Sequence, residues 1–206
     1  MTAATISAFS APPAAGFGDA VMQSQQTFRR ALEALAHPGS IYELDVACGV
    51  PPGLSVGMTA ILLALADVDA PVWLPADVDE RVHHYLRFHC GCPLVSEPAQ
   101  ARFAVVPAGY AAPDLTQCHP GDPAYPDTST TLLLEVESLD NADGGASVVL
   151  SGPGIASQRV LSVNGLRTDF WTQWRANQHL FPLGVDVFLI QGNRVCGLPR
   201  TVMVEG

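Results

Sequence analysis

Apolar side chains in the first part of the chain recur first with the spacing of a helix and then with that of a strand. After Asp19, a residue that favours the N-cap position, apolar residues recur at helical spacing until a stop signal at 37–39. This spacing places them on one face of a helix. Residues 40–46 then alternate apolar with acidic side chains, which is the period of a half-buried strand. The pattern predicts a helix followed directly by a strand.

Helical and strand patterns continue to alternate toward the C-terminus. Residues 58–66 are apolar nearly all round and predict a buried helix, and the capping pair Asp77 and Glu80 predicts another that stops at Gly91. A last helix is expected over 168–179, and a loop over 108–128. Strands are expected at 71–74, 102–106, 131–136, 147–150, 185–191 and 194–198, the last two joined as a hairpin. This order predicts an α/β fold with helices packed on a mixed sheet.

The chain reads as one domain with an N-terminal extension. Its 206 residues contain no internal repeat and no linker, and a single domain commonly spans roughly 100–200 residues. Residues 1–18 are small and Pro/Ala-rich and carry no basic residue, unlike a secretory signal. We therefore expect a flexible arm over 1–18 and a single α/β domain over 19–206. Five irregularly spaced cysteines favour reduced thiols and a cytoplasmic location.

Charge excludes several classes of function. The formal net charge is −10, and all ten basic residues are scattered arginines, so we expect binding neither to nucleic acid nor to anionic membranes. The longest apolar run, 58–66, is far shorter than the roughly 20 residues that a membrane-spanning helix needs. Because lysine is absent, the chain can form no Schiff base with pyridoxal phosphate and has no Walker A lysine.

A serine motif suggests hydrolase chemistry, although a simpler interpretation is favoured. Residues 53–57 match G-x-S-x-G, in which the serine needs a sharp turn between a strand and a helix. Pro51 and Pro52 precede the motif where the strand should be. Ser55 is more simply an N-cap for the helix that follows.

Histidines and cysteines offer ligands for zinc, but their spacing is unsuitable. Cys90 and Cys92 are separated by a single residue, which is shorter than the usual gap between zinc cysteines, and His83 and His84 fall on different faces of a helix. Asp67 and Asp69 form a possible divalent-ion pair with too few ligands. We expect no metal site.

Two further features are candidate anion-binding sites. Gly152 and Gly154 form a turn directly after a predicted strand, where backbone amides can hold a phosphate; a simple tight turn explains them as well. His37, Arg87 and His89 stand at predicted helix ends, where a general base or an anion ligand could lie. The helix dipole alone also favours a cation at such an end.

Short segments distributed in order from about residue 20 to the C-terminus together form a recognisable pattern. They are Phe28-Arg29-Arg30, His37-Pro38-Gly39, Leu65-Ala66-Asp67, Ala70-Pro71-Val72-Trp73, Leu86-Arg87-Phe88-His89, Pro93-Leu94-Val95, Gly152-Pro153-Gly154-Ile155, Phe181-Pro182-Leu183-Gly184-Val185-Asp186 and Leu198-Pro199-Arg200-Thr201. In colinear order these segments resemble the PhnH family of the bacterial carbon–phosphorus lyase system, which degrades phosphonates. Cys90, Cys92 and the loop around Cys118 fall outside the family pattern.

The resemblance implies a three-layer α/β sandwich related to the large domain of pyridoxal-phosphate-dependent transferases, without any cofactor. It also implies a homodimer in isolation and a core complex with PhnG, PhnI and PhnJ. With PhnG, PhnI and the ATPase-like PhnL, the family is required to form alpha-D-ribose 1-methylphosphonate 5-triphosphate from ATP and methylphosphonate.

Two alternatives remain open beside such a subunit without activity of its own: a stand-alone phosphonate- or nucleotide-binding protein, and a purely architectural dimer. The residues expected to bind substrate or a partner are His37, Asp67, Asp69, Arg87, His89, Gly152, Gly154, Asp186 and Arg200.

Overall fold

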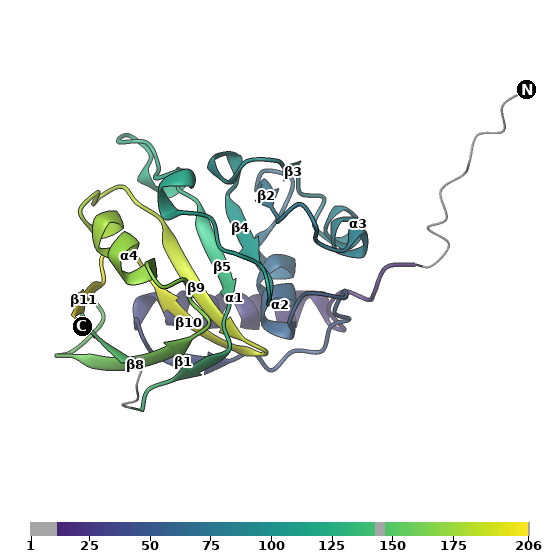
Figure 1. Ribbon diagram of the computed structural model, residues 1–206. Helices are drawn as coiled ribbons and strands as arrows, with labels where there is room; N and C mark the ends of the chain where they lie inside the picture. Colours follow the sequence, from purple (N-terminus) through teal and green to yellow (C-terminus); the bar gives the residue numbers. More distant parts are fainter. Residues whose placement is uncertain (1–11, 143–146, 206) are drawn as a thin grey trace, which may run out of the picture.

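The computed structural model describes residues 12–142 and 147–205, and its largest element is a seven-stranded mixed sheet (Figure 1). The strand order is β1-β10-β9-β5-β4-β2-β3. Strands β9, β5, β4, β2 and β3 run parallel to one another. At the β9 side, β10 pairs antiparallel with β9, and β1 pairs antiparallel with β10. The strands are β1 (Ile41–Glu43), β2 (Val72–Trp73), β3 (Leu94–Val95), β4 (Phe103–Val106), β5 (Thr131–Glu135), β9 (Asp186–Gln191) and β10 (Arg194–Leu198).

A second, antiparallel sheet of four strands packs on one face of the first. Its order is β11-β7-β8-β6, so the last strand of the chain closes one edge. The chain between β5 and β9 supplies the other three strands and a helix. The four strands are β6 (Ser138–Asp140), β7 (Ser147–Ser151), β8 (Arg159–Asn164) and β11 (Met203–Glu205).

Side-chain caps explain where the first three helices begin, whereas the fourth has no side-chain capping bond. Asp19 accepts a hydrogen bond from the Met22 amide at 3.0 Å, and Ser55 accepts one from the Met58 amide at 3.2 Å. The third helix begins at Glu80 with Asp79 as its cap, so the predicted cap at Asp77 is wrong by two residues. The helices are α1 (Ala20–Ala36), α2 (Val56–Leu65), α3 (Glu80–His89) and α4 (Phe170–Gln178), with short 3-10 turns η1 (Pro98–Gln100), η2 (Leu115–Gln117) and η3 (Pro126–Thr128).

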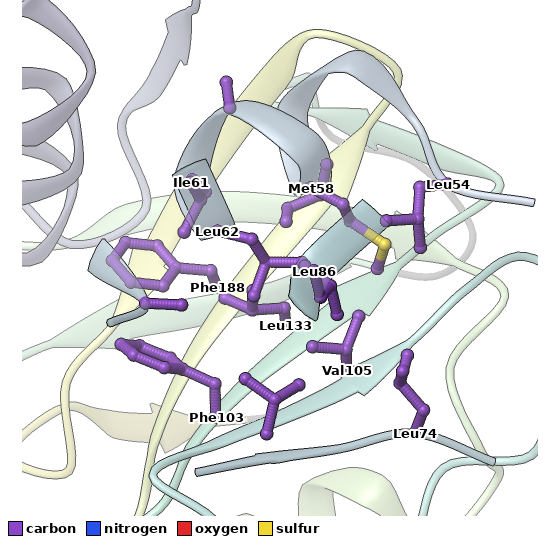
Figure 2. Packing of buried hydrophobic residues seen from close by; sticks show 14 of the residues in the cluster. Leu54, Met58, Ile61, Leu62, Leu74, Leu86, Phe103, Val105, Leu133 and Phe188 are labelled. Carbon is purple, nitrogen blue, oxygen red and sulfur yellow. The ribbon is translucent and has the colours of Figure 1, made fainter. Parts of the chain in front are cut away.

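The seven-stranded sheet is covered on both faces, so its parallel strands are buried on both sides. Adjacent residues of a strand point to opposite faces. In β5, Leu133 packs among side chains of α2 and α3, as Figure 2 shows with Ile61 and Leu86. Leu132 and Leu134 pack on the other side against α4 and the second sheet. Trp174 of α4 is fully buried there, and its indole nitrogen donates to the Val202 carbonyl at 3.0 Å.

The predicted α/β class with a mixed sheet is confirmed, and the strand expected at 71–74 is present as β2. Strands β3, β6, β8 and β11 were not predicted. Of these, β3 has two residues, too few to show a period, and β6 and β11 have three each. Residues 14–18 of the predicted arm contact the domain: the Gly18 amide donates to Ala47 and the Gly49 amide to Ala15. Residues 1–11 lie outside the described residues. Within the described ranges, no helix is both long and apolar enough to cross a membrane.

Candidate functional site

A small pocket lies at the carboxyl ends of β4 and β5, in the middle of the parallel part of the sheet. Its volume is about 220 Å³. Loops after β4 and β8 and the first residue of α4 close its sides, and it is lined by Val106, Tyr110, Ala111, Ala112, Leu134, Glu135, Gly165, Leu166, Arg167 and Phe170. Open α/β sheets bind ligands outside the carboxyl ends of their strands. A volume below roughly 300 Å³ suits a small molecule rather than a dinucleotide.

Arg167 is the cationic residue of this pocket. Hydrogen bonds hold its side chain in place but do not use all of its N–H donors. Its Nε and one terminal nitrogen donate to the Asp169 carboxylate at 3.0 and 2.9 Å, and the other terminal nitrogen donates to the Ala112 carbonyl at 3.1 Å. A guanidinium group has five N–H donors. Two of them have no partner among the described residues. The Arg167 guanidinium, with the Gln173 amide, also holds the pKa of Asp169 below its usual value.

Tyr110 and Glu135 supply the other polar side chains at this end of the sheet. The Tyr110 hydroxyl donates to the Asp77 carbonyl at 2.9 Å, which ties the loop after β4 to the loop after β2. Glu135 ends β5, and its Oε1 accepts from the Gly192 amide at 2.8 Å. Its Oε2 is buried and has no hydrogen-bond partner among the described residues. Burial raises the pKa of the Glu135 carboxyl; the nearby Ser55 hydroxyl and the Gly192 amide oppose that rise.

At the opposite, amino end of the strands, Arg200 forms a closed network with Asp186. The Arg200 guanidinium donates to both carboxylate oxygens of Asp186, at 3.1 and 2.6 Å. Its remaining N–H groups donate to the carbonyls of Pro126 and Pro182 and to the Ser129 hydroxyl. All five donors are used, and the Arg200 side chain is only 12% exposed. These two candidate residues therefore join three segments of the chain and leave no donor for a ligand.

The structure brings His37 together with the glycine turn, and the packing there is close. A side chain added at Gly154 would lie 2.2 Å from the Ala36 carbonyl oxygen, and Gly154 has a φ of +82°. Backbone of the α1 C-terminus therefore occupies the space next to this glycine, and the tight-turn interpretation accounts for it. Gly152 has a φ of +129° and approaches the carbonyl of Thr201 in the same way.

The remaining candidates belong neither to the pocket nor to the network of Arg200 and Asp186. His89 contacts the N-terminal segment through a 2.8 Å hydrogen bond between its Nε2 and the Ala14 carbonyl. Arg87 is 63% exposed and lies 4.0 Å from Glu80. Asp67 accepts a bond from the Asp69 amide at 2.9 Å, which is a local turn.

Asp69 borders a surface hollow of about 460 Å³ that Arg102 and His119 also line. Across residues 12–142 and 147–205, no group of three or more His, Cys, Asp or Glu side chains is placed to hold a metal ion.

Sequence motifs alone did not indicate Tyr110, Glu135 or Arg167. For Tyr110 and Glu135 the available signal was positional: Tyr110 follows the predicted strand 102–106 and Glu135 lies at the end of 131–136, and such positions belong at the carboxyl edge of a parallel sheet. Arg167 follows β8, which was not predicted. Ser55, the serine of the apparent hydrolase motif, caps α2, as its simpler interpretation requires.

The fold and the pocket define a two-sheet α/β protein with a small, mostly apolar pocket, which also contains Arg167, at the carboxyl ends of its central parallel strands. Residues 15–205 match the family described as bacterial phosphonate metabolism protein (PhnH), and the chain belongs to that family. It is 37% identical over 190 residues to the alpha-D-ribose 1-methylphosphonate 5-triphosphate synthase subunit PhnH of Rhizobium meliloti (strain 1021), covering 92% of this chain and 94% of that protein.

A second relative is the putative C-P lyase subunit protein HtxG of Stutzerimonas stutzeri. It is 29% identical over 189 residues, which cover 89% of this chain and 86% of the relative. Both relatives are named as subunits, and both alignments span nearly the whole domain. The family resemblance expected from the sequence is confirmed.

Proposed function

We propose that this chain is a non-autonomous subunit of a carbon–phosphorus lyase complex. In that role it is required, with PhnG, PhnI and PhnL, to form alpha-D-ribose 1-methylphosphonate 5-triphosphate from ATP and methylphosphonate. The observation that carries the proposal is the 37% identity with a named synthase subunit over 94% of that relative's length. The proposal includes PhnJ as a further member of the core complex and a cytoplasmic location.

An exposed apolar stripe on α1 supports association with another protein. Val21, Phe28 and Leu32 are 78, 51 and 57% exposed and follow one another at helical spacing. A different side of α1 is buried through Thr27, Ala31 and Ala34 and packs on α2 and β10, so the exposed stripe is not needed for the packing of the helix within this chain. An apolar surface that is solvated in a single chain commonly marks a protein interface. In our proposal another subunit of the complex covers this stripe, and a second copy covers it when the chain is alone.

Co-purification tests the assembly directly. The chain is co-expressed with PhnG, PhnI and PhnJ from the same organism, and the four proteins are expected to purify together. Phe28→Glu should abolish its recovery with the others and leave thermal unfolding unchanged, because the side chain is already half exposed. Phe88→Glu on α3, where Phe88 is 66% exposed, is the matched control and should still co-purify. Failure of the unaltered chain to co-purify would refute the subunit role.

We further propose that the pocket at the carboxyl ends of β4 and β5 takes a small oxyanion such as a phosphonate. The two remaining N–H donors of Arg167 support this, since a guanidinium binds such groups through paired hydrogen bonds. Calorimetric titration of the purified complex with methylphosphonate should detect binding, and Arg167→Ala should weaken it about tenfold or more, the effect of losing a charged hydrogen bond. Arg102→Ala, at the opposite end of the sheet, should not. Equal binding by both variants would remove this pocket from the proposal.

The stand-alone alternative makes a different prediction. If the isolated chain binds ATP or methylphosphonate as tightly as the complex does, a separate binding protein replaces the subunit. The architectural alternative predicts that Arg167→Ala leaves growth on methylphosphonate intact. We also propose a fold shared with the large domain of pyridoxal-phosphate-dependent transferases, without the cofactor. The mixed sheet and the absence of lysine support it.

A further inference from the structure

A larger hollow adjoins the small pocket at the loop that follows β8. Residues of β7, β8 and α4 line it, among them Val163 and Trp171, and its volume is about 460 Å³. Gly165, Leu166 and Arg167 line both the hollow and the small pocket, so the two spaces are neighbours. We call the larger space the α4 hollow. Its volume falls within the range of roughly 300–1,000 Å³ that is typical of sites for ligands larger than a small oxyanion.

The charged side chains that line the α4 hollow are arginines. Arg167 and Arg175 belong to its described lining, which contains no aspartate or glutamate. Each of four other hollows on the described part of the chain is lined by at least one acidic residue. The chain has 20 acidic and ten basic residues, so a lining of this composition runs against its overall charge. Such a lining attracts an anion.

The two arginines are held in different ways. Asp169 pairs with Arg167 at 2.9 Å and offsets part of its charge. Arg175 lies on α4, and its Nε donates to the Val204 carbonyl of β11 at 3.4 Å, which keeps the side chain beside the hollow. An arginine guanidinium is well suited to phosphate because its planar donors match the phosphate oxygens. Arg175 therefore gives the hollow a phosphate-binding group that the small pocket lacks.

Trp171 adds a flat aromatic side chain to the same lining. It follows Arg167 by four residues and precedes Arg175 by four, and residues four apart on α4 lie on one face of the helix. Its ring packs edge-to-face with Phe170, with centroids 5.0 Å apart and planes at 80°, and it remains partly exposed. Trp174, on the same helix, is fully buried. Bases of nucleotides stack on aromatic side chains of this kind.

We propose that the α4 hollow binds a nucleoside triphosphate, with the base on Trp171 and the phosphates at Arg175. The inference rests on the proposed function, in which ATP and methylphosphonate meet in one complex, and it adds the subunit and the surface that hold the nucleotide. The phosphonate occupies the small pocket next to it. Both ligands are anions and repel each other, and the Arg167 guanidinium, which lines both spaces, reduces that repulsion.

Photolabelling tests where the base lies. The probe is ATP that carries an azide on the purine ring, and it is added to the purified complex of this chain with PhnG, PhnI and PhnJ. PhnL is left out because an ATPase-like protein binds the probe as well. Trypsin cleaves after Arg167 and after Arg175, so residues 168–175 form one peptide that contains Trp171. After irradiation this peptide should carry the label, and an excess of ordinary ATP should prevent labelling.

Variants separate the base from the phosphates in calorimetric titrations of the complex. Trp171→Ala should weaken ATP binding about tenfold, the effect of losing one stacked base, and leave inorganic tripolyphosphate binding unchanged. Trp171→Phe keeps an aromatic face and should retain most of the affinity. Arg175→Gln should weaken both ligands about tenfold, because it removes a charged hydrogen-bond donor. Arg81→Ala, which removes an exposed arginine of α3, is the control and should bind both ligands as the wild type does.

The outcomes distinguish this inference from the subunit role. A label found only on other peptides or on another subunit overturns the inference, and so does a folded Trp171→Ala variant that binds ATP as tightly as the wild type. The subunit role survives either result, because it depends on co-purification. If the complex does not assemble, the subunit role fails, and photolabelling of the isolated chain at residues 168–175 then decides whether the α4 hollow takes the nucleotide.

Discussion

Arg200 and Arg167 lie at opposite ends of the parallel strands, each beside an aspartate, and they differ in how much of their bonding capacity the fold uses. All five side-chain N–H donors of Arg200 bond to protein atoms, and its side chain is 12% exposed. Three N–H donors of Arg167 bond to protein atoms, and its side chain is 35% exposed. At the amino end, Arg200 therefore holds chain segments together. At the carboxyl end, Arg167 lines the pocket and keeps two N–H donors without a partner among the described residues. Saturation of donors, rather than the presence of an Arg–Asp pair, distinguishes the two.

Removing Arg200 should produce the largest change. Arg200→Ala leaves the Asp186 carboxylate, 20% exposed, without its cation, and breaking a buried pair in this way costs about 3–5 kcal/mol. Urea unfolding at neutral pH measures the loss. Arg81→Ala, which removes an exposed pair with Asp79, is the control and should change stability by less than about 1 kcal/mol. Equal losses would mean that Arg200 is no more structural than a surface residue.

A smaller loss is expected for Tyr110→Phe at the carboxyl end. The variant removes the hydroxyl that donates to the Asp77 carbonyl at 2.9 Å, and one such bond contributes about 1 kcal/mol. Thermal unfolding checks it, with Tyr125→Phe on a 66% exposed side chain as the control. If Tyr110→Phe lowers the free energy of unfolding as much as Arg200→Ala does, the carboxyl end is as important for stability as the amino end, and the contrast between the two ends fails.

Glu135→Gln should have the smallest effect, with the opposite sign. Because the folded protein raises the Glu135 pKa, folding favours the protonated form. The stability that this group contributes is complete below its unfolded pKa of about 4.3 and is lost as pH rises through the folded value. Glutamine keeps the acceptor for Gly192 without the charge.

The variant should therefore be more stable than wild type at pH 7, by less than about 1 kcal/mol, the usual net value of one such group. The difference should shrink as pH falls toward 4. Urea unfolding at both pH values measures this difference, and a variant that is less stable at pH 7 would contradict a net cost of burying the charged Glu135 carboxylate.

The sequence allowed the Asp186–Arg200 pairing to be predicted better than the pocket. Residues 185–191 and 194–198 form the expected hairpin, and the two open ends of a hairpin lie side by side, which brings Asp186 next to Arg200. The pocket instead joins loops that follow β4, β8 and β5. Chain order does not determine which strands become neighbours in a parallel sheet, so periodicity had no means of bringing Tyr110 to Arg167.

One missed element did carry a usable signal. In β8, Leu161 and Val163 are buried and alternate with Ser162 and Asn164, which is the strand period. The glycine turn is a different case. The spacing of Gly152 and Gly154 is compatible with a phosphate cradle and with a tight turn, and in the fold the backbone of Ala36 packs directly against Gly154, where an added side chain would lie 2.2 Å from its carbonyl oxygen. Local sequence does not show what packs against a turn.

The strand order also constrains when the protein can fold during its synthesis. Strand β1 pairs with β10, β5 pairs with β9, and β7 pairs with β11. Each of these partners lies between residues 186 and 205. This segment must therefore leave the ribosome before both sheets can be completed, and pairings this distant in sequence form slowly. Until β9 is available, one edge of β5 has no strand partner, and an unpaired strand edge can pair with another chain and promote aggregation.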